Sequence, residues 1–598
     1  MIGGSGAPRQ RVLVAAITCV GLLRGMWWVA TTPVWSPIDE QAHYDFVEAI
    51  GSGDGIPIVG KTHVHDDVLR IEKSSPTSPW RSVPVPADAT RGQWHAARQS
   101  YEAAQPPLYY AVMAPVWRAT DGARTIASIY ALRIASLLLS LLLVPLVWLI
   151  GRELFPDSPE VGLVAAGLVV VFSGVNGNFA IVANDGLMTV FAAGVLLAMA
   201  RTVRRGLSDG RALAVGMLVG AALLTKTTGL ALVGVVAVGA LIAARGWRDY
   251  VRFGAIGGGV AAVMLAPWLL FNHAHYGGLT ASKQLDAITG SLQSDPPLNL
   301  HGMATRLRQA GHGFFDAQLL NTNLSRYSLL WFGVTAVVSA GALVVLWRRR
   351  QHRDVAVLAW LLAAWPIAFA TMAFVILHLS GGRSDIAGRH LYVALPAVAV
   401  ALAFAAQRAF RRWSLVALGV VAAIGLTFEA SDAPGVMRAA YSAGAFGNVA
   451  PVVDRSFADR TVAGGGFTFT APCPIVATRL FFADGTSQLF DNGERTTTTQ
   501  IDVPATARVA ASASGPAYQL YCVTVHNNDA RFRQTFRRGH VPLTRAEVAF
   551  FPRMWAVLAW GLVAVAAFSI TRWGRRESGP HASAFSSEDA RSAPPVTR

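Results

Sequence analysis

The sequence predicts an all-α polytopic membrane protein with a β-rich segment near its C-terminus. The chain has 598 residues, of which 53% are hydrophobic and only 14% are charged. Soluble domains carry about a quarter charged residues. The mean hydropathy is +0.41, and long apolar runs recur along the whole length. These observations together indicate a bundle of membrane-spanning helices.

The apolar runs predict about twelve spans. The formal net charge is +16, but its arginines lie in alternate short links between the runs, as the positive-inside rule requires. We therefore expect a lipid bilayer and no nucleic acid as partner. The first run is long and lacks a small-residue cleavage site, so we expect a retained span rather than a signal peptide. The predicted spans are residues 12–31, 126–150, 161–180, 185–202, 212–225, 228–244, 252–271, 328–347, 355–378, 388–407, 413–429 and 551–571.

With the N-terminus inside, three large segments lie outside: 32–125, 272–327 and 430–550. The last has a period-two pattern and turn residues, which predict a small β-rich domain. It contains Cys473 and Cys522, which an oxidising compartment would allow to form a disulfide. The expected domains are a transmembrane domain over 1–429 with its first outer loop, the β-rich domain over 430–550, a last span over 551–571, and a disordered cytoplasmic tail over 572–598.

An acidic pair, Asp39 and Glu40, follows the first predicted span within a few residues. Arg9 and Arg11 flank the other end of that span, so both carboxylates are expected on the extracytoplasmic side. Carboxylates at such a place are either solvated loop residues or chemically active groups. We favour chemistry because other polar residues gather on the same predicted side.

Two of these polar positions are the pair Asn184-Asp185 and Lys226. Asp185 lies in a short turn, where it is either an Asx turn or helix N-cap or a second acid converging on Asp39. Lys226 interrupts a long apolar stretch on the outer side, against the positive-inside trend. It is either a snorkelling lysine or a functional cation.

A further cluster, Arg389 and His390, lies at the start of the tenth predicted span, on the outer side. The guanidinium of Arg389 suits a phosphate, although a local pair with Asp385 is the alternative. The segment 105–110 carries two prolines and leads into an apolar stretch too short to span, which predicts an interfacial helix or a wall of a substrate groove.

These residues describe one kind of chemistry when they are taken together. Acids can deprotonate an acceptor hydroxyl or bind a divalent metal. Cations can hold a phosphate leaving group. We therefore expect group transfer from a lipid-phosphate donor at the outer face of a membrane.

With these motifs in view, the chain resembles the GT-C superfamily of polytopic glycosyltransferases. The matching features are the acid of the first outer loop, the segment 105–110, Asn184-Asp185, Lys226 and the run 388–392. The motif over 37–43 is especially similar to the domain-of-unknown-function 2142 family, which itself resembles the dolichyl-phosphate-mannose protein mannosyltransferases. The chain lacks the Trp-Trp-Asp signature of oligosaccharyltransferases, so we expect transfer of a single sugar.

The resemblance implies a polyprenyl-phosphate sugar donor, a glycan or protein acceptor, and an extracytoplasmic active site in the inner (plasma) membrane. It implies inverting transfer of a hexose or pentose, with Asp39 as catalytic base. It leaves open a divalent metal, Mg or Mn. The resemblance also implies Glu40 as partner acid or metal ligand and Asp185 as second acid. Lys226 and Arg389 would contact the donor phosphate. The implied supporting residues are His43, Asn184 and His390, and His43 would either orient Asp39 or simply pack.

Two other classes of function stay open. A flippase or transporter of lipid-linked sugars would show internal repeats and polar residues at the membrane midplane. Neither is evident here, because the polar residues lie at one interface. A non-catalytic assembly protein for cell-envelope glycans is the second alternative.

Overall fold

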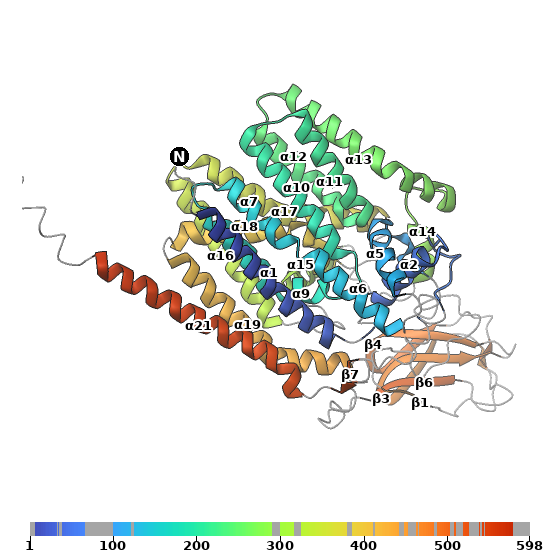
Figure 1. The fold of residues 1–598 in the computed structure, drawn as a ribbon. Coiled ribbons are helices and arrows are strands. Elements are labelled where there is room, and N and C mark those ends of the chain that lie inside the picture. The colour runs from blue at the N-terminus through green and yellow to red at the C-terminus, as the bar shows by residue number, and fades with distance from the viewer. Residues whose placement is uncertain are drawn as a thin grey trace, which may run out of the picture.

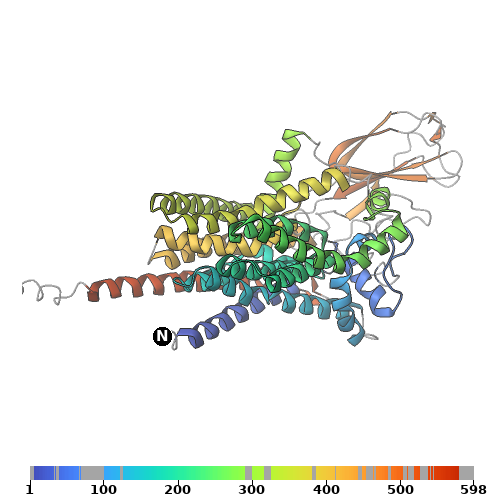
Figure 2. The same cartoon turned by 90° about the horizontal axis from the view of Figure 1, so that it is seen from above.

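The computed structural model describes residues 6–32, 34, 39–65, 68, 100–120, 125–289, 299–315, 325–379, 386–410 and 413–441, and beyond these the strands and last helix given below. Long helices form a bundle, and a small sheet lies at one end of it (Figures 1 and 2). The helices are α1 (Gly6–Thr31), α2 (Glu40–Ser52), η1 (Tyr101–Ala104), α5 (Leu108–Ala119), α6 (Thr125–Ser140), α7 (Leu143–Leu154), α8 (Glu160–Val171), α9 (Ser173–Phe179), α10 (Asp185–Arg205), α11 (Asp209–Thr225), η2 (Thr227–Leu230), α12 (Ala231–Ala243), α13 (Trp247–Tyr276), α14 (Ser282–Thr289), α15 (Leu300–Phe314), α16 (Ser325–Arg348), α17 (His352–Leu379), η3 (Gly388–Ala394), α18 (Leu395–Phe410), α19 (Ser414–Tyr441) and α21 (Arg545–Glu577).

Nine helical segments of the described chain are long and apolar enough to cross a membrane, and the bent pair α8 and α9 makes a tenth candidate. The predicted fold class, an all-α polytopic membrane protein, is confirmed. The count of twelve spans stays a prediction. Two of the expected spans are α11 and α12, which have 17 and 13 residues. Both are shorter than the roughly 20 residues that usually cross a bilayer.

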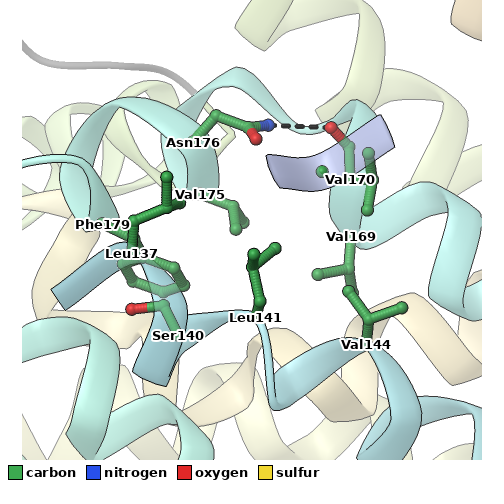
Figure 3. A pocket seen from close by; sticks show the side chains of 10 residues that line it. Leu137, Ser140, Leu141, Val144, Val169, Val170, Val175, Asn176 and Phe179 are labelled. Carbon is green, nitrogen blue, oxygen red and sulfur yellow. Dashed lines mark hydrogen bonds between the residues drawn. The ribbon is translucent and has the colours of Figure 1, made fainter. Parts of the chain in front are cut away.

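The bend between α8 and α9 is 60° and falls at Phe172, whose backbone is extended. Polar side chains take up the carbonyls that the bend frees. Asn176 donates to Val170 O at 2.7 Å and to Phe172 O at 3.0 Å. Figure 3 shows the first of these bonds beside a small cavity of about 20 Å³, the size that holds a single water molecule. Ten residues of α1, α6, α7, α8, α9 and the α6–α7 connection line the cavity: Gly21, Leu137, Ser140, Leu141, Val144, Val169, Val170, Val175, Asn176 and Phe179.

A buried ion pair between α1 and α19 also bonds residues on both sides of this bend. Arg24 of α1 donates to Glu429 of α19, with 2.9 Å between Nη2 and Oε2, and both side chains are at most 4% exposed. Ser173, the first residue of α9, also donates to Glu429 Oε2 at 2.9 Å. Arg24 Nε reaches Val170 O at 3.1 Å. The charge of each partner is therefore satisfied inside the bundle, as membrane burial requires.

Helices α2 and α5, which lie between α1 and α6 in the sequence, are at one end of the bundle (Figures 1 and 2). Helices α2 and α5 pack on each other through Tyr44, Phe46, Tyr110 and Met113 and join Ile129 of α6 in one hydrophobic cluster. In both views these two helices lie at the end of the bundle opposite the N-terminus (Figures 1 and 2). We call this end the polar end, because the charged residues described below gather there.

The sheet lies at the polar end in both views (Figures 1 and 2). Four antiparallel strands are ordered β1-β6-β3-β4, and two short two-stranded pairs, β2-β5 and β7-β8, accompany them. The division of the chain into domains, and the placement of this segment outside the membrane, stay predictions. The strands are β1 (Asn448–Val452), β2 (Val462–Ala463), β3 (Gly466–Phe481), β4 (Ser487–Asp502), β5 (Arg508–Val509), β6 (Tyr518–Thr524), β7 (Arg537–Arg538) and β8 (Val541–Pro542).

Candidate active site at the polar end of the bundle

Four charged side chains form a continuous row at the polar end. Lys226 Nζ lies 2.7 Å from Asp185 Oδ1, and Arg389 Nε lies 4.0 Å from Asp185 Oδ2. Arg389 Nη2 then donates to Asp39 Oδ2 at 3.0 Å. These four residues come from sequence positions far apart, and all four were candidates from the sequence. We call them the ionic row.

Asp39 is the most accessible member of the ionic row, with 34% of its side chain exposed. Its backbone is left-handed, with φ 56° and ψ 14°, at the N-cap of α2. This conformation costs most residues about 1–2 kcal/mol, although aspartate and asparagine adopt it more readily than other non-glycine residues. The carboxylate does not cap its own helix, as an N-cap aspartate usually does. It accepts instead from Arg389 and, at 2.9 Å, from the hydroxyl of Tyr101.

Asp185 and Lys226 are brought together by the packing of α10 against the end of α11. Asp185 is the first residue of α10, and Asn184 before it donates from Nδ2 to Thr225 O at 3.2 Å. Lys226 follows Thr225 directly and has an extended backbone, which separates α11 from η2. Asn184 is fully buried, so it supports the pair by holding the two helix ends in place.

Arg389 lies in η3, which leads into α18. The preceding Gly388 approaches α15 so closely that an added Cβ would lie 1.9 Å from the carbonyl carbon of Gly313. Only glycine fits there, and the approach fixes where η3 begins. His390 follows Arg389 in η3, is half-buried, and donates its backbone N–H to Ala387 O at 3.0 Å. Asp385, the alternative local partner of Arg389, lies outside the described residues.

Glu40, the neighbour of Asp39, has a different environment. Its side chain is fully buried, and Arg133 of α6 donates to both oxygens, at 2.6 Å to Oε1 and 2.5 Å to Oε2. The backbone N–H of Val182 adds a third bond at 3.1 Å. The role of Glu40 as a partner acid stays untested, but this geometry favours a structural role. Arg133 was not a candidate from the sequence, although an arginine inside a predicted span should have indicated a buried partner.

His43 is hydrogen-bonded to Tyr110 and not to the Asp39 carboxylate. Its Nδ1 bonds the hydroxyl of Tyr110 at 2.8 Å and lies 3.7 Å from Glu102 Oε2. Burial first, and then the charges of Lys226 and Arg389, hold the pKa of His43 well below its usual value, so the imidazole is neutral. Neither Tyr101 nor Glu102 was a candidate from the sequence, although both lie just before the segment 105–110.

The geometry disfavours Glu40 as a metal ligand beside Asp39, because Arg133 and Val182 already donate to its two oxygens. Within the described part of the chain, no group of three or more histidine, cysteine or acidic side chains has the arrangement of a metal centre. A divalent metal therefore stays a prediction, and the mechanism below has no step through one.

Two other expectations from the sequence concern regions beside the site. The apolar stretch after the two prolines is the helix α5, which buries Tyr109 and Tyr110 against α2 and α6. Cys473 and Cys522 lie in the paired strands β3 and β6, where Cys522 is opposite Ile475. Their side chains lie outside the described atoms, so the disulfide stays a prediction.

Comparisons with known proteins agree with the motifs. Residues 115–271 match a family model described as dolichyl-phosphate-mannose-protein mannosyltransferase. The match covers about a quarter of the chain and includes Asp185 and Lys226, but neither Asp39 nor Arg389. No curated protein matches the chain at the significance required.

Among solved structures, ArnT from Cupriavidus metallidurans bound to undecaprenyl phosphate is 16% identical, with a TM-score of 0.45 over 72% of this chain and 66% of that one. The archaeal oligosaccharyltransferase AglB from Archaeoglobus fulgidus, in complex with an inhibitory peptide and a dolichol-phosphate, is 12% identical, with a TM-score of 0.42 over 68% and 51%. The chain thus spans just under two thirds of the length of ArnT. Over residues 115–271 it is similar to the dolichyl-phosphate-mannose-protein mannosyltransferases, which confirms the family resemblance that its motifs indicated.

Proposed function

We propose that this protein is a membrane glycosyltransferase that moves one sugar from a polyprenyl-phosphate donor to a hydroxyl of a cell-envelope glycan or protein. The reaction takes place on the extracytoplasmic face of the inner (plasma) membrane. It inverts the configuration at the anomeric carbon of the transferred sugar. The observation that carries the proposal is the ionic row, in which an accessible carboxylate contacts Arg389 and is linked through Asp185 to Lys226 at the end of the bundle.

Asp39 acts as the general base. The acceptor hydroxyl lies against its exposed carboxylate and gives up its proton to it as the acceptor oxygen bonds to the anomeric carbon. The bond between the anomeric carbon and the phosphate oxygen breaks, and its electron pair leaves with the polyprenyl phosphate. Tyr101, which donates to Asp39 Oδ1 at 2.9 Å, holds the carboxylate in place.

Arg389 and Lys226 stabilise the leaving phosphate. Arg389 has several N–H groups in a planar fork, so it can keep its bond to Asp39 while another N–H faces a phosphate. Lys226 is buried and already balanced by Asp185, with only 8% of its side chain exposed. Charge that develops on the phosphate as the bond breaks therefore meets preorganised, largely buried cations, and such cations stabilise charge strongly.

Replacement of Asp39 by asparagine should reduce transfer by about 10²–10⁴-fold, the usual effect of removing a general base. Asparagine tolerates the left-handed backbone, so the fold should be kept. The assay uses membranes and radiolabelled polyprenyl-phosphate mannose, arabinose, glucose and galactose, with label counted in glycan and protein fractions. Asp54→Asn is the matched control, because Asp54 lies just beyond α2 and its side chain is 64% exposed.

Label that moves with wild type and Asp54→Asn but not with Asp39→Asn would support the transferase and name its donor. Near-normal transfer by Asp39→Asn would refute the base assignment. No transfer from any of the four donors by folded protein would favour a lipid-linked sugar flippase or a non-catalytic assembly role.

A further inference from the structure

Glu102 is a buried carboxyl group beside the ionic row that the mechanism above does not use. It lies in η1, next to Tyr101, which bonds Asp39. The residue is 8% exposed, and its Oε2 accepts no hydrogen bond from the described part of the chain. A buried carboxylate oxygen that carries charge without a hydrogen bond is costly, so this geometry favours a protonated, neutral group.

The nearest basic group does not neutralise Glu102. His43 Nδ1 is 3.7 Å from Glu102 Oε2, beyond hydrogen-bonding distance, and it bonds Tyr110 at 2.8 Å instead. His43 is neutral because burial lowers its pKa. The contact between Glu102 and His43 is therefore not an ion pair.

The electrostatics of the site agree with a neutral Glu102. Burial first, and then the negative charge of Asp39, raise the pKa of Glu102 to about 8, although Lys226 and Arg389 act in the opposite direction. The titratable and charged groups around Glu102 come from six elements. They are Asp39 at the N-cap of α2, His43 within α2, Tyr101 of η1, Tyr110 of α5, Asp185 of α10, Lys226 after α11 and Arg389 of η3.

The charges of the site give Glu102 a specific consequence. Asp39 and Asp185 carry two negative charges, and Lys226 and Arg389 carry two positive charges, so the ionic row is neutral. The buried Glu40–Arg133 pair behind it is neutral as well. Ionised Glu102 would leave the site with three carboxylates against two cations, and hence one net negative charge in a poorly hydrated place.

We propose that the proton on Glu102 controls phosphate binding at this site: with Glu102 neutral the ionic row admits the anionic donor, and with Glu102 ionised the site repels it. The inference rests on the proposed function, because it gives the phosphate to Lys226 and Arg389. It makes Glu102 a positioning residue that acts through the charge of the ionic row, and it predicts loss of donor affinity at alkaline pH.

The test measures binding of farnesyl methyl phosphate, a phosphodiester that stays a monoanion, to the full-length protein in detergent micelles at pH 7 and pH 9. If only the form with neutral Glu102 binds, the competent fraction falls to about one tenth at pH 9, so the apparent Kd should rise about tenfold. Glu102→Gln is uncharged at both pH values and should lose this dependence. Glu48→Gln, a matched change on the nearby helix α2, should retain it, and uncharged farnesol should show none in any protein.

Three results would overturn the inference and differ in what they say about the function. Equal wild-type affinity at both pH values refutes the role of Glu102 but leaves the phosphate site standing. A tenfold loss of affinity that persists in Glu102→Gln shows that another group causes the pH dependence. It refutes the role of Glu102 but leaves the phosphate site standing. Failure of wild type to bind the phosphodiester at either pH removes the phosphate site and the inference together.

A second measurement does not depend on the folding of the variant. Infrared spectra of wild-type protein, recorded across pH 6 to 10, should show a protonated-carboxyl band that disappears near pH 8. A spectrum without that band at pH 6 would show that Glu102 is ionised throughout, which contradicts the proposal.

Discussion

Two neighbouring carboxylates, Asp39 and Glu40, each pair with an arginine, yet the two pairs differ in almost every other respect. The Glu40–Arg133 pair is fully buried, and the arginine donates to both carboxylate oxygens. The Asp39–Arg389 pair has a single bond of 3.0 Å, with 34% of Asp39 and 17% of Arg389 exposed. The peptide unit between the two acids directs one side chain into the bundle and the other toward solvent.

The different burial and hydrogen bonding of Asp39 and Glu40 show that adjacent acids in a motif need not have the same role. A fully buried carboxylate held by a bidentate arginine is out of reach of a substrate, and removing its charge leaves the arginine buried without a counter-charge. A half-exposed pair can exchange its partner for a ligand at little cost. We therefore assign stability to Glu40 and chemistry to Asp39, and the experiments below test this division.

The largest effect on stability is expected for Glu40→Gln. The change leaves the Arg133 guanidinium buried without a counter-charge, which typically costs 3–5 kcal/mol. Asp39→Asn should cost at most about 1 kcal/mol, because half-exposed ion pairs contribute little. Thermal unfolding of both variants in the same detergent checks the contrast. Equal unfolding temperatures for the two variants would contradict the assigned division.

Arginine-to-lysine changes at both pairs allow a matched comparison, and we expect effects of intermediate size on stability and on transfer rate. Arg133→Lys loses one of two bonds to Glu40 and the bond of 2.8 Å to Thr32 O, so the unfolding temperature should fall. Arg389→Lys cannot reach Asp39 and Asp185 together. The loss of one charge-assisted bond should lower kcat/KM for the donor about ten- to a hundredfold, with little change in stability. The opposite pattern would be a lower unfolding temperature for Arg389→Lys and a lower kcat/KM for Arg133→Lys. That result would assign chemistry to the Glu40–Arg133 pair and stability to the Asp39–Arg389 pair, which contradicts the division made here.

The smallest effect concerns a third pair, between Asp45 of α2 and His65 in the chain that follows the helix. His65 Nδ1 lies 2.7 Å from Oδ1 of the buried Asp45, and that bond, opposed by burial, raises the pKa of His65 to about 9. Because the folded-state pKa lies above the unfolded value of about 6.5, the stabilisation is complete below pH 6.5 and is lost as the pH rises through 9. With 27% of the imidazole exposed, we expect about 1 kcal/mol.

The difference in unfolding temperature between wild type and His65→Gln, followed from pH 6 to pH 9.5, measures this contribution. The difference should shrink toward zero as the pH rises. A difference that is constant with pH would show that the imidazole contributes by packing and not by charge.

The sequence predicted the fold class because long apolar runs and alternating basic links report directly on membrane crossing. It also named all four residues of the ionic row, since charged groups at span ends are rare enough to stand out. It did not separate Asp39 from Glu40, because the direction of each side chain depends on the left-handed backbone at the start of α2. It missed Arg133, which is 93 residues from Glu40, because periodicity carries no information on which distant helix packs against a loop.

The same reasoning applies to Arg24 and Glu429, which pair across 405 positions of the chain. Each lies within a predicted apolar run, and a charge in such a run requires a partner. The signal for a buried pair was therefore present in the sequence, as two opposite charges in spans, but the partner of each could be identified only from the packing of α1 and α19 against α8.

The most direct test of the account measures transfer rate per folded molecule and unfolding temperature together, for Asp39→Asn and Glu40→Gln in the same preparation. The account predicts that Asp39→Asn loses at least about 10²-fold in rate with its unfolding temperature nearly unchanged. It predicts that Glu40→Gln has a clearly lower unfolding temperature. Normal transfer by Asp39→Asn, or a Glu40→Gln protein as stable as wild type, would contradict it.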